Sequence, residues 1–464
     1  MLIRAAEVAG RSPVDVRVRD GRVAEIGALV PAAGEPVLDA GGGLLLPGLH
    51  DHHIHLAAFA AARASVRCGP PEVHDADELA AALAGPGSGW LRGIGYHESV
   101  AGLPDASALD ALAPHRPLRI QHRSGRMWLL NSLALDTLLA REAPPPGLER
   151  VDGRWTGRLF DEDAWLRRAL GGTWPDFAAV SGELAGFGVT GVTDMSPAND
   201  PATAAHFAQR QRAGRLVQRA ILAGTPALAQ ASWGPGLGLG PVKLHLHEAA
   251  LPPLDEAIRT VATAHADGRG IAVHCTSEVE LVFALAAIES AGPRSGDRIE
   301  HAGVASDGLV GEIARLGLQV VTQPHFITER GDQYLRAVEP RDIPHLYRLA
   351  EFERAGVPLA GGSDAPFGTA DPWAAMRAAV SRRTAGGAVI GAGEALSPER
   401  ALRLYLADPL DLPRQRTIGP GAPADLCLLD RPWSQARRRL RADDVRATLI
   451  GGSVVRQRVD QPPL

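Results

Sequence analysis

Near both ends of the chain, apolar and polar residues alternate over short stretches separated by glycine turns. Residues 14–26 alternate around an Asp-Gly turn and predict a β-hairpin, and residues 446–457 repeat this pattern around a glycine pair. No helical periodicity appears in the residues before the first histidine-rich stretch. We therefore predict one small β-sandwich domain built from both termini, residues 1–47 and 415–464.

The middle of the chain has a different rhythm, in which short apolar stretches alternate with stretches of helical period. The apolar run 44–46, ahead of a Pro-Gly turn, is expected to be the strand that leads into this region. Further strands are expected at residues 189–194, 216–222, 242–246, 270–274, 298–301, 318–323 and 358–364, and helices at 254–266, 278–290, 309–316 and 346–354. Eight strands alternating with helices predict an α/β fold, a (β/α)8 TIM-like barrel, at residues 48–414.

The strand–helix rhythm stops between about residues 57 and 180. This stretch is far longer than an ordinary βα loop and carries helix and strand patterns of its own. We interpret it as a long insertion after barrel strand 1 that shapes the pocket. An independent subdomain without a role in the site is the alternative.

Residues of metal-ligand type stand at the ends of the predicted strands. His53 and His55 are two residues apart, so both imidazoles lie on one face of an extended chain. The ends of later strands carry Lys243, His274, His301 and Asp364. Because barrel active sites lie at the C-terminal ends of the strands, we predict that these residues form a metal site.

Composition and charge narrow the function classes. A net charge of −5 and 5% aromatic residues argue against a nucleic-acid partner. The three scattered cysteines fit a reducing compartment. Neither a signal peptide nor a membrane-spanning run is apparent. We expect a cytoplasmic protein that acts on a small molecule, with no nucleic-acid or membrane partner. Whether the chain forms a homodimer is left open.

The motifs around these strand ends resemble the amidohydrolase superfamily, and more narrowly the amidohydrolase family 3, YtcJ-like branch of metal-dependent hydrolases. The matching pieces of the barrel and C-terminal region are Pro47-Gly48 through His53-Ile54-His55, Val242-Lys243, Val273-His274, Arg298-Ile299-Glu300-His301, Gly362-Ser363-Asp364-Ala365-Pro366 and Gly419-Pro420-Gly421-Ala422-Pro423-Ala424-Asp425-Leu426. In the insertion, the matching pieces are Arg116-Pro117-Leu118, Ser124-Gly125 and Asn131-Ser132. The resemblance covers nearly the whole chain.

The resemblance implies a binuclear metal centre. His53, His55 and Asp364 would hold one divalent ion. His274 and His301 would hold a second, and Lys243, carboxylated on its amine, would bridge the two. Zinc is the expected metal, with other divalent ions as alternatives. Asp364 would accept the proton of a metal-bridging hydroxide and pass it to the leaving nitrogen, as general base and then acid.

We therefore expect a metal-dependent hydrolase that cleaves a carbon–nitrogen bond, other than a peptide bond, in an amide, N-acyl or N-formyl substrate. Hydrolysis of a cyclic amide or an ester, or a metal-dependent lyase reaction, is the alternative among enzymes. The alternative outside the enzymes is a catalytically inactive relative of the family that serves as a binding protein. The retained set of metal-ligand-type residues argues against a loss of catalytic activity.

The chain departs from the branch at positions that bear on the substrate. His245 and His247 follow Lys243 where the branch has Asp-Gly, and their role as ligands, substrate contacts or surface residues stays open. Arg126 stands where the branch commonly has histidine, so we predict that it holds an acidic group of the substrate, with a surface arginine as the alternative. Further candidates for lining the pocket, with packing as the alternative, are His97, Trp128 and His325.

Overall fold

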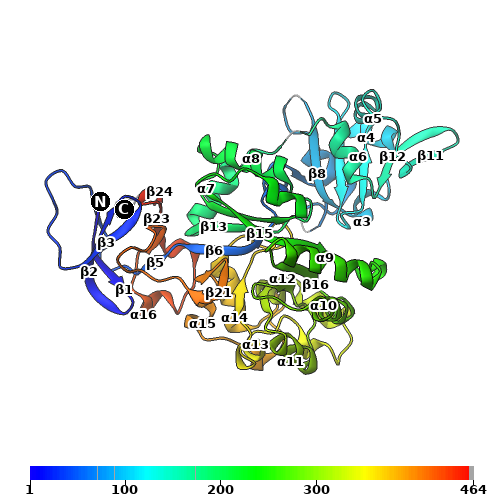
Figure 1. Cartoon of the computed structure of the whole chain (residues 1–464). Coiled ribbons are helices and arrows are strands. Elements are labelled where there is room, and N and C mark those ends of the chain that lie inside the picture. The colour runs from blue at the N-terminus through cyan, green and yellow to red at the C-terminus, as the bar shows by residue number, and fades with distance from the viewer. Residues whose placement is uncertain (71, 88, 173, 459–464) are drawn as a thin grey trace. The chain divides into compact units, whose positions relative to one another are not determined.

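The computed structural model describes the chain except residues 71, 88, 173 and 459–464, so the last six residues of the predicted C-terminal β region lie outside the described part. The chain forms two compact units (Figure 1). Unit 1 comprises Met1–Leu56 and Phe177–Leu464, and unit 2 comprises Ala57–Asp176.

Unit 1 contains a parallel eight-stranded sheet that curls into a nearly closed barrel. In sheet order its strands are β19 (Leu359–Gly361), β18 (Gln319–Thr322), β17 (Arg298–His301), β16 (Ile271–Cys275), β15 (Leu237–His245), β14 (Arg219–Gly224), β13 (Val189–Asp194) and β6 (Leu49–Ile54). The two outer strands meet where the Asp364 amide donates to the His53 carbonyl at 2.7 Å and the His55 amide to the Ala365 carbonyl at 2.9 Å. These bonds place the end of the last strand beside the end of the first.

Helices follow the barrel strands in the chain. They are α7 (Ala178–Gly186), α8 (Pro201–Arg212), α9 (Leu254–Ala266), α10 (Glu278–Ala291), α11 (Asp307–Arg315), α12 (His325–Ala337), α13 (Ala350–Arg354), α14 (Pro372–Ser381) and α15 (Pro398–Arg403). Side-chain caps mark where several of them begin. Asp200 and Ser277 form capping boxes at α8 and α10, and Ser397 caps α15.

A β-sandwich in unit 1 combines strands from the N-terminal and C-terminal parts of the chain (Figure 1). One sheet contains β3 (Arg22–Gly27), β2 (Arg11–Arg19), β1 (Leu2–Val8) and β4 (Val37–Asp39). The other contains β24 (Ser453–Gln457), β23 (Val445–Ile450), β22 (Leu426–Leu429) and β5 (Leu45–Pro47). Apolar side chains from both sheets, including Ile3, Val16, Leu428 and Leu449, form one buried cluster. The predicted fold class, a barrel with a terminal β-sandwich and an insertion after strand 1, is confirmed.

The predicted strand at residues 44–46 does form, but it lies in the sandwich, within the predicted domain 1–47, and is not one of the eight barrel strands. It is β5, and it pairs with β22 of the sandwich. The first barrel strand is instead the histidine-bearing β6, which pairs with β13. An apolar run can face either core, and only the partner strand decides which sheet it joins.

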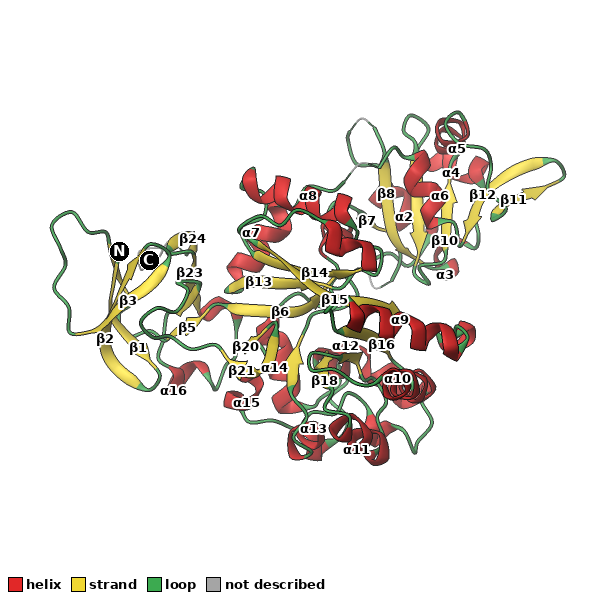
Figure 2. Cartoon of the chain, viewed as in Figure 1, coloured by secondary structure: helices red, strands yellow, loops and turns green. Residues whose placement is uncertain are grey.

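Unit 2 is built on a six-stranded sheet with helices packed against it (Figure 2). The strands are β11 (Leu148–Val151), β12 (Arg154–Phe160), β10 (Met127–Leu130), β9 (Leu118–His122), β8 (Leu91–Tyr96) and β7 (Val66–Arg67). The helices of this part of the chain are α1 (Leu56–Arg63), α2 (Ala76–Leu83), α3 (Glu98–Ala101), α4 (Ala106–Leu112), α5 (Ser132–Leu139) and α6 (Asp163–Ala169). Two buried apolar clusters, one containing Leu118 and Ile120 and the other Trp128 and Leu130, give this unit its own core.

Some helices differ from the sequence expectation. α8, α12 and α14 were not predicted, and the helix expected at 346–354 is confined to Ala350–Arg354. The buried residues of α12 are His325, Phe326 and Ile327 in its first turn, and Gly331. Unit 1 also contains the short strands β20 (Ala407–Asp408) and β21 (Asp411–Gln415) and the helix α16 (Trp433–Ala436). Among the described residues, no helix has the length and apolar character needed to cross a bilayer.

Candidate metal centre

Two histidines at the end of the first barrel strand meet one carboxylate that follows the last barrel strand. His53 lies in β6, His55 directly after it, and Asp364 after β19. The Nε2 atoms of His53 and His55 lie 3.4 Å and 3.2 Å from the Asp364 Oδ1 atom. The i, i+2 spacing thus brings both imidazoles to the same acidic group.

Asp364 adopts a backbone conformation that is uncommon for a residue with a side chain. Its φ is +53°, in the left-handed region. The preceding amide, that of Ser363, donates to the Asp51 carboxylate at 2.9 Å, and the His53 amide donates to the same oxygen at 3.1 Å. Asp51 therefore ties the Asp364 turn to β6.

The other predicted ligands lie on the neighbouring strands. The rings of His53 and His301 are 4.7 Å apart, and those of His274 and His301 are 4.5 Å apart, between centroids. His301 also has a positive φ, +71°, and its Nδ1 atom is 2.7 Å from the Gln323 Oε1 atom. Lys243 is buried in β15, the strand next to β16, which carries His274.

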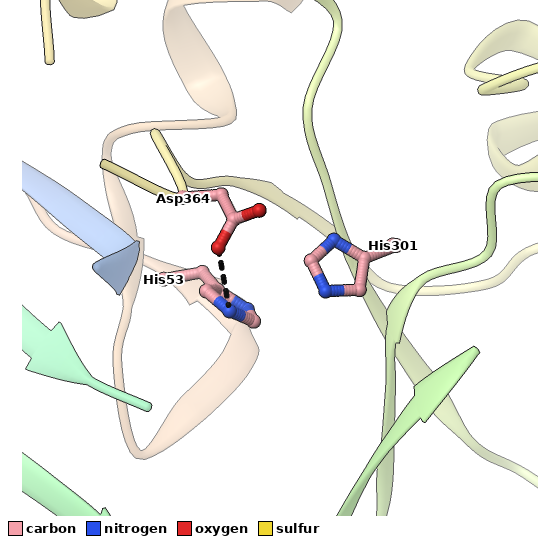
Figure 3. A group of neighbouring side chains, drawn as sticks. All are labelled: His53, His301 and Asp364. Carbon is pink, nitrogen blue, oxygen red and sulfur yellow. Dashed lines mark ion pairs between the residues drawn. The ribbon is translucent and has the colours of Figure 1, made fainter. Parts of the chain in front are cut away.

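The nitrogen and oxygen atoms of this cluster fit a divalent metal. One candidate ligand atom from each of His53, His301 and Asp364 lies within 4.8 Å of the others (Figure 3). Among the described residues, the buried His53 Nε2 and Lys243 Nζ atoms have no hydrogen-bond partner. Buried polar atoms without partners are costly, and imidazole with carboxylate is a typical zinc donor set.

Burial decides the protonation states. Desolvation lowers the pKa of His53, His274 and His301, so these imidazoles are neutral and can act as ligands. Burial alone would raise the pKa of Asp364. The His55 hydrogen bond and the closeness of the His53 and His301 rings outweigh it and hold that pKa below its usual value, which keeps the carboxylate ionised.

The sequence reasoning did not assign a role to Glu300. This buried carboxylate lies in β17, 2.5 Å from the His53 Nδ1 atom and 2.5 Å from the Arg298 Nε atom. It orients His53 so that Nε2 faces Asp364, which is the usual function of a carboxylate behind a ligating histidine. A charged residue within a buried strand was the available signal.

His245 and His247 continue from the end of β15. The His245 ring stacks on the His274 ring at a centroid distance of 4.3 Å, and the His247 ring lies 4.5 Å from that of His245. Both side chains are exposed. The structure thus places His245 beside a candidate ligand and leaves its role open.

The four predicted substrate contacts have other partners in the structure. Arg126 forms a bidentate pair with Asp161, at 2.8 Å and 2.7 Å, and both side chains are exposed. The buried Trp128 donates its indole N–H to Asp163 at 2.9 Å. His97 caps α3 by accepting from the Ser99 amide.

His325 is buried in unit 1, and its Nε2 atom lies 3.0 Å from the Ser363 carbonyl, next to Asp364 in the chain. This contact supports the Asp364 turn. The three other candidates belong to unit 2, and their contacts there are structural. Roles for all four in substrate binding stay a prediction.

Comparisons with known proteins cover almost the entire chain. The model of the amidohydrolase family matches residues 36–456. An N-substituted formamide deformylase from Arthrobacter pascens is 26% identical to this chain. The alignment is 522 residues long and covers 97% of this chain and 96% of that protein. A putative amidohydrolase, YtcJ, from Bacillus subtilis strain 168 is 23% identical over 481 residues, 89% of either chain.

The fold also matches a solved structure. An uncharacterized metal-dependent hydrolase from Pyrococcus furiosus superimposes with a TM-score of 0.75 at 22% identity, covering 93% of this chain and 98% of the other. The matches include the sandwich, the barrel and the insertion, so the likeness is not limited to the common barrel.

Proposed function

This chain belongs to the amidohydrolase family, as a metal-dependent hydrolase of carbon–nitrogen bonds other than peptide bonds, and we propose that its substrate is an amide of the N-acyl or N-formyl class. The observation that supports this proposal is the convergence of the His53 and His55 imidazoles on the ionised Asp364 carboxylate. The likeness to an N-substituted formamide deformylase over nearly both full lengths supports the formyl class.

We assign two divalent ions, most simply zinc, to the donor set. His53, His55 and Asp364 would hold one, and His274 and His301 would hold the other. Lys243, as a carbamate, would contribute to both. When bound, the ions supply a Lewis acid for the scissile carbonyl and make water more acidic.

The protein residues supply the proton transfer. Asp364 Oδ1 faces both histidines, which leaves Oδ2 to accept a proton from the attacking water. The water oxygen bonds to the carbonyl carbon, the carbon–nitrogen bond breaks, and Asp364 returns the proton to the leaving nitrogen. The products are a carboxylic acid and an amine. The Nε2 atoms of His53 and His55 would be occupied by the ion, so Asp364 is the group suited to this proton.

The test combines metal analysis with a substrate panel. We expect up to two divalent ions per purified chain, and release of formate or another acid together with amine from N-formyl and N-acyl compounds. His53→Ala should abolish activity, and Asp364→Asn should lower kcat by roughly 100-fold to 10,000-fold. Full activity without metal would overturn the metal assignment. Hydrolysis of esters or cyclic amides alone would overturn the substrate class.

Lys243 carries the most specific prediction of this proposal. It is the single lysine of the sequence, against 47 arginines among the 48 basic residues. An arginine stays protonated and cannot be carboxylated, whereas burial lowers the pKa of Lys243 to about 8, which makes its neutral amine accessible. The amine nitrogen would bond to the carbon of CO₂ and lose a proton, giving an anionic carbamate.

A chain labelled with ¹³C at lysine reports on this one residue. We expect its NMR signal to show coupling to a carbamate carbon when the protein is prepared with ¹³C-bicarbonate. Lys243→Arg keeps a positive charge and should lose the paired metals as completely as Lys243→Ala does. An unmodified Lys243 in the active protein, or two retained ions in Lys243→Arg, would contradict the assignment.

A further inference from the structure

Two arginines lie side by side on the sheet of unit 2. Arg92 in β8 and Arg119 in β9 are register partners of a parallel pair, so their side chains share one face. Both guanidinium carbons lie 5.5 Å from the centroid of the buried Trp128 ring, and that of Arg119 lies 5.8 Å from Trp90. The two charges are thus framed by tryptophan rings.

Among the described residues, neither guanidinium has a carboxylate partner. Arg92 donates only to neutral oxygens, Ser65 Oγ at 3.2 Å and Gln121 Oε1 at 3.4 Å. The Nε atom of Arg119 is buried without a hydrogen-bond acceptor. The nearby Asp163 carboxylate accepts from the Trp128 indole instead. By contrast, other arginines of this unit are paired, such as Arg126 with Asp161.

This arrangement is costly without a ligand. Like charges directly opposite each other on neighbouring strands repel, and a half-buried charge without a partner loses hydration. Desolvation, with the Arg92 charge, lowers the pKa of Arg119 to about 10. The tryptophan faces offset part of the cost through cation–π attraction. An anion placed between the two guanidiniums would remove the remainder.

We propose that Arg92 and Arg119 form an oxyanion-binding site, which takes the carboxylate or phosphate group of a small molecule beside the partly exposed Trp90. Paired guanidinium N–H donors match the coplanar oxygens of such a group. Arg126, predicted from the sequence for this role, already has a carboxylate partner, whereas these two arginines have none within the described part of the chain. The site goes beyond the proposed hydrolysis, and its test requires no turnover.

The experiment uses the full-length, metal-loaded chain labelled with 5-fluorotryptophan. The ¹⁹F signal of Trp128, identified among the eight tryptophans by Trp128→Phe, reports on the site itself rather than on the barrel. Benzoate and inorganic phosphate are the probes, and benzamide is the neutral analogue of benzoate. We expect benzoate, phosphate or both to shift the Trp128 signal in a saturable way, whereas benzamide leaves it unchanged. The probe with the lower Kd identifies the preferred group.

Variants separate binding from folding. Arg119→Gln and Arg92→Gln should each weaken the preferred probe at least about tenfold, because a charged contact is lost. Arg150→Gln is the matched control, since Arg150 also covers a tryptophan, Trp155 at 4.9 Å, but lies exposed on β11. It should leave the Kd unchanged. A Trp128 signal that neither anion moves, or equal Kd values in all variants, would overturn the proposal.

Discussion

Glu300 illustrates how a single residue can control the site without contacting the substrate. Its carboxylate bonds to the His53 ring on one side and to the buried Arg298 guanidinium on the other. Arg298 in turn donates to the His52 carbonyl at 2.9 Å. The orientation of the His53 ring in β6 therefore depends on an ion pair within β17.

Glu300→Gln should weaken metal binding by roughly 10-fold to 100-fold, because the amide is a poorer partner for the His53 Nδ1–H. Competition with a chromophoric chelator measures this affinity. The variant should also be less stable, since it leaves the buried Arg298 charge without a counter-ion.

The double variant Glu300→Gln with Arg298→Met separates the two effects. Removing the uncompensated charge should restore much of the free energy of unfolding but not the metal affinity. Recovery of both would show that Glu300 acts on metal binding only through stability.

At the scale of elements, one side chain connects two loops that follow barrel strands. Glu280, buried in α10, accepts from the Thr276 amide at 2.7 Å and the Ser277 amide at 3.2 Å. Its other oxygen accepts from the Glu248 amide at 2.9 Å, directly after His247. The carboxylate thus holds the segment carrying the exposed histidine pair against the loop after His274.

Glu280→Ala should lower the free energy of unfolding by roughly 1.5–3 kcal/mol, because several amides lose a charged acceptor. Urea denaturation measures the change. Glu289→Ala, in the exposed part of the same helix, removes only a surface pair with Arg315 and should stay within about 0.5 kcal/mol. Similar losses in the two variants would mean that helix propensity, not the loop contacts, sets the effect.

At the scale of the whole molecule, buried histidines make stability depend on pH. Burial lowers the pKa of His50, His52, His53 and His325, the last to about 4, from an ordinary value near 6.5. Below pH 6.5 the unfolded chain therefore binds protons that the folded chain does not. Asp51 opposes this with one proton, because burial raises its pKa to about 6. Four histidines lose a proton-binding capacity on folding and one aspartate gains it, so the unfolded chain binds more protons in total.

We expect the free energy of unfolding to fall as the pH drops from 6.5 towards 4, by about 1.4 kcal/mol per pH unit for each unmatched proton. Urea titrations of metal-free protein at several pH values give the slope without proton-linked metal binding. His325→Gln keeps a donor for the Ser363 carbonyl and removes one titrating group, so it should reduce the slope. A stability that stays flat over this window, or an unchanged slope in the variant, would contradict the linkage.

Local patterns in the sequence were sufficient for many of the elements and for the type of chemistry. β13, β17 and α9 begin and end at the predicted residues, because alternation and capping act over a few neighbours. The predicted metal-type residues stand at strand ends for the same local reason. Their convergence follows from the parallel barrel, in which all strand ends point the same way.

Only the tertiary structure decided which partners those residues meet. The run 44–46 joined the sandwich because β22, nearly 400 residues later in the chain, supplies its hydrogen bonds. The positive φ of Asp364, the Glu300 carboxylate behind His53 and the unpaired Arg92 and Arg119 likewise depend on distant strands. Periodicity determines which face of an element is buried. The energy of a buried charge depends on what the folded chain places against it, and no local pattern contains that information.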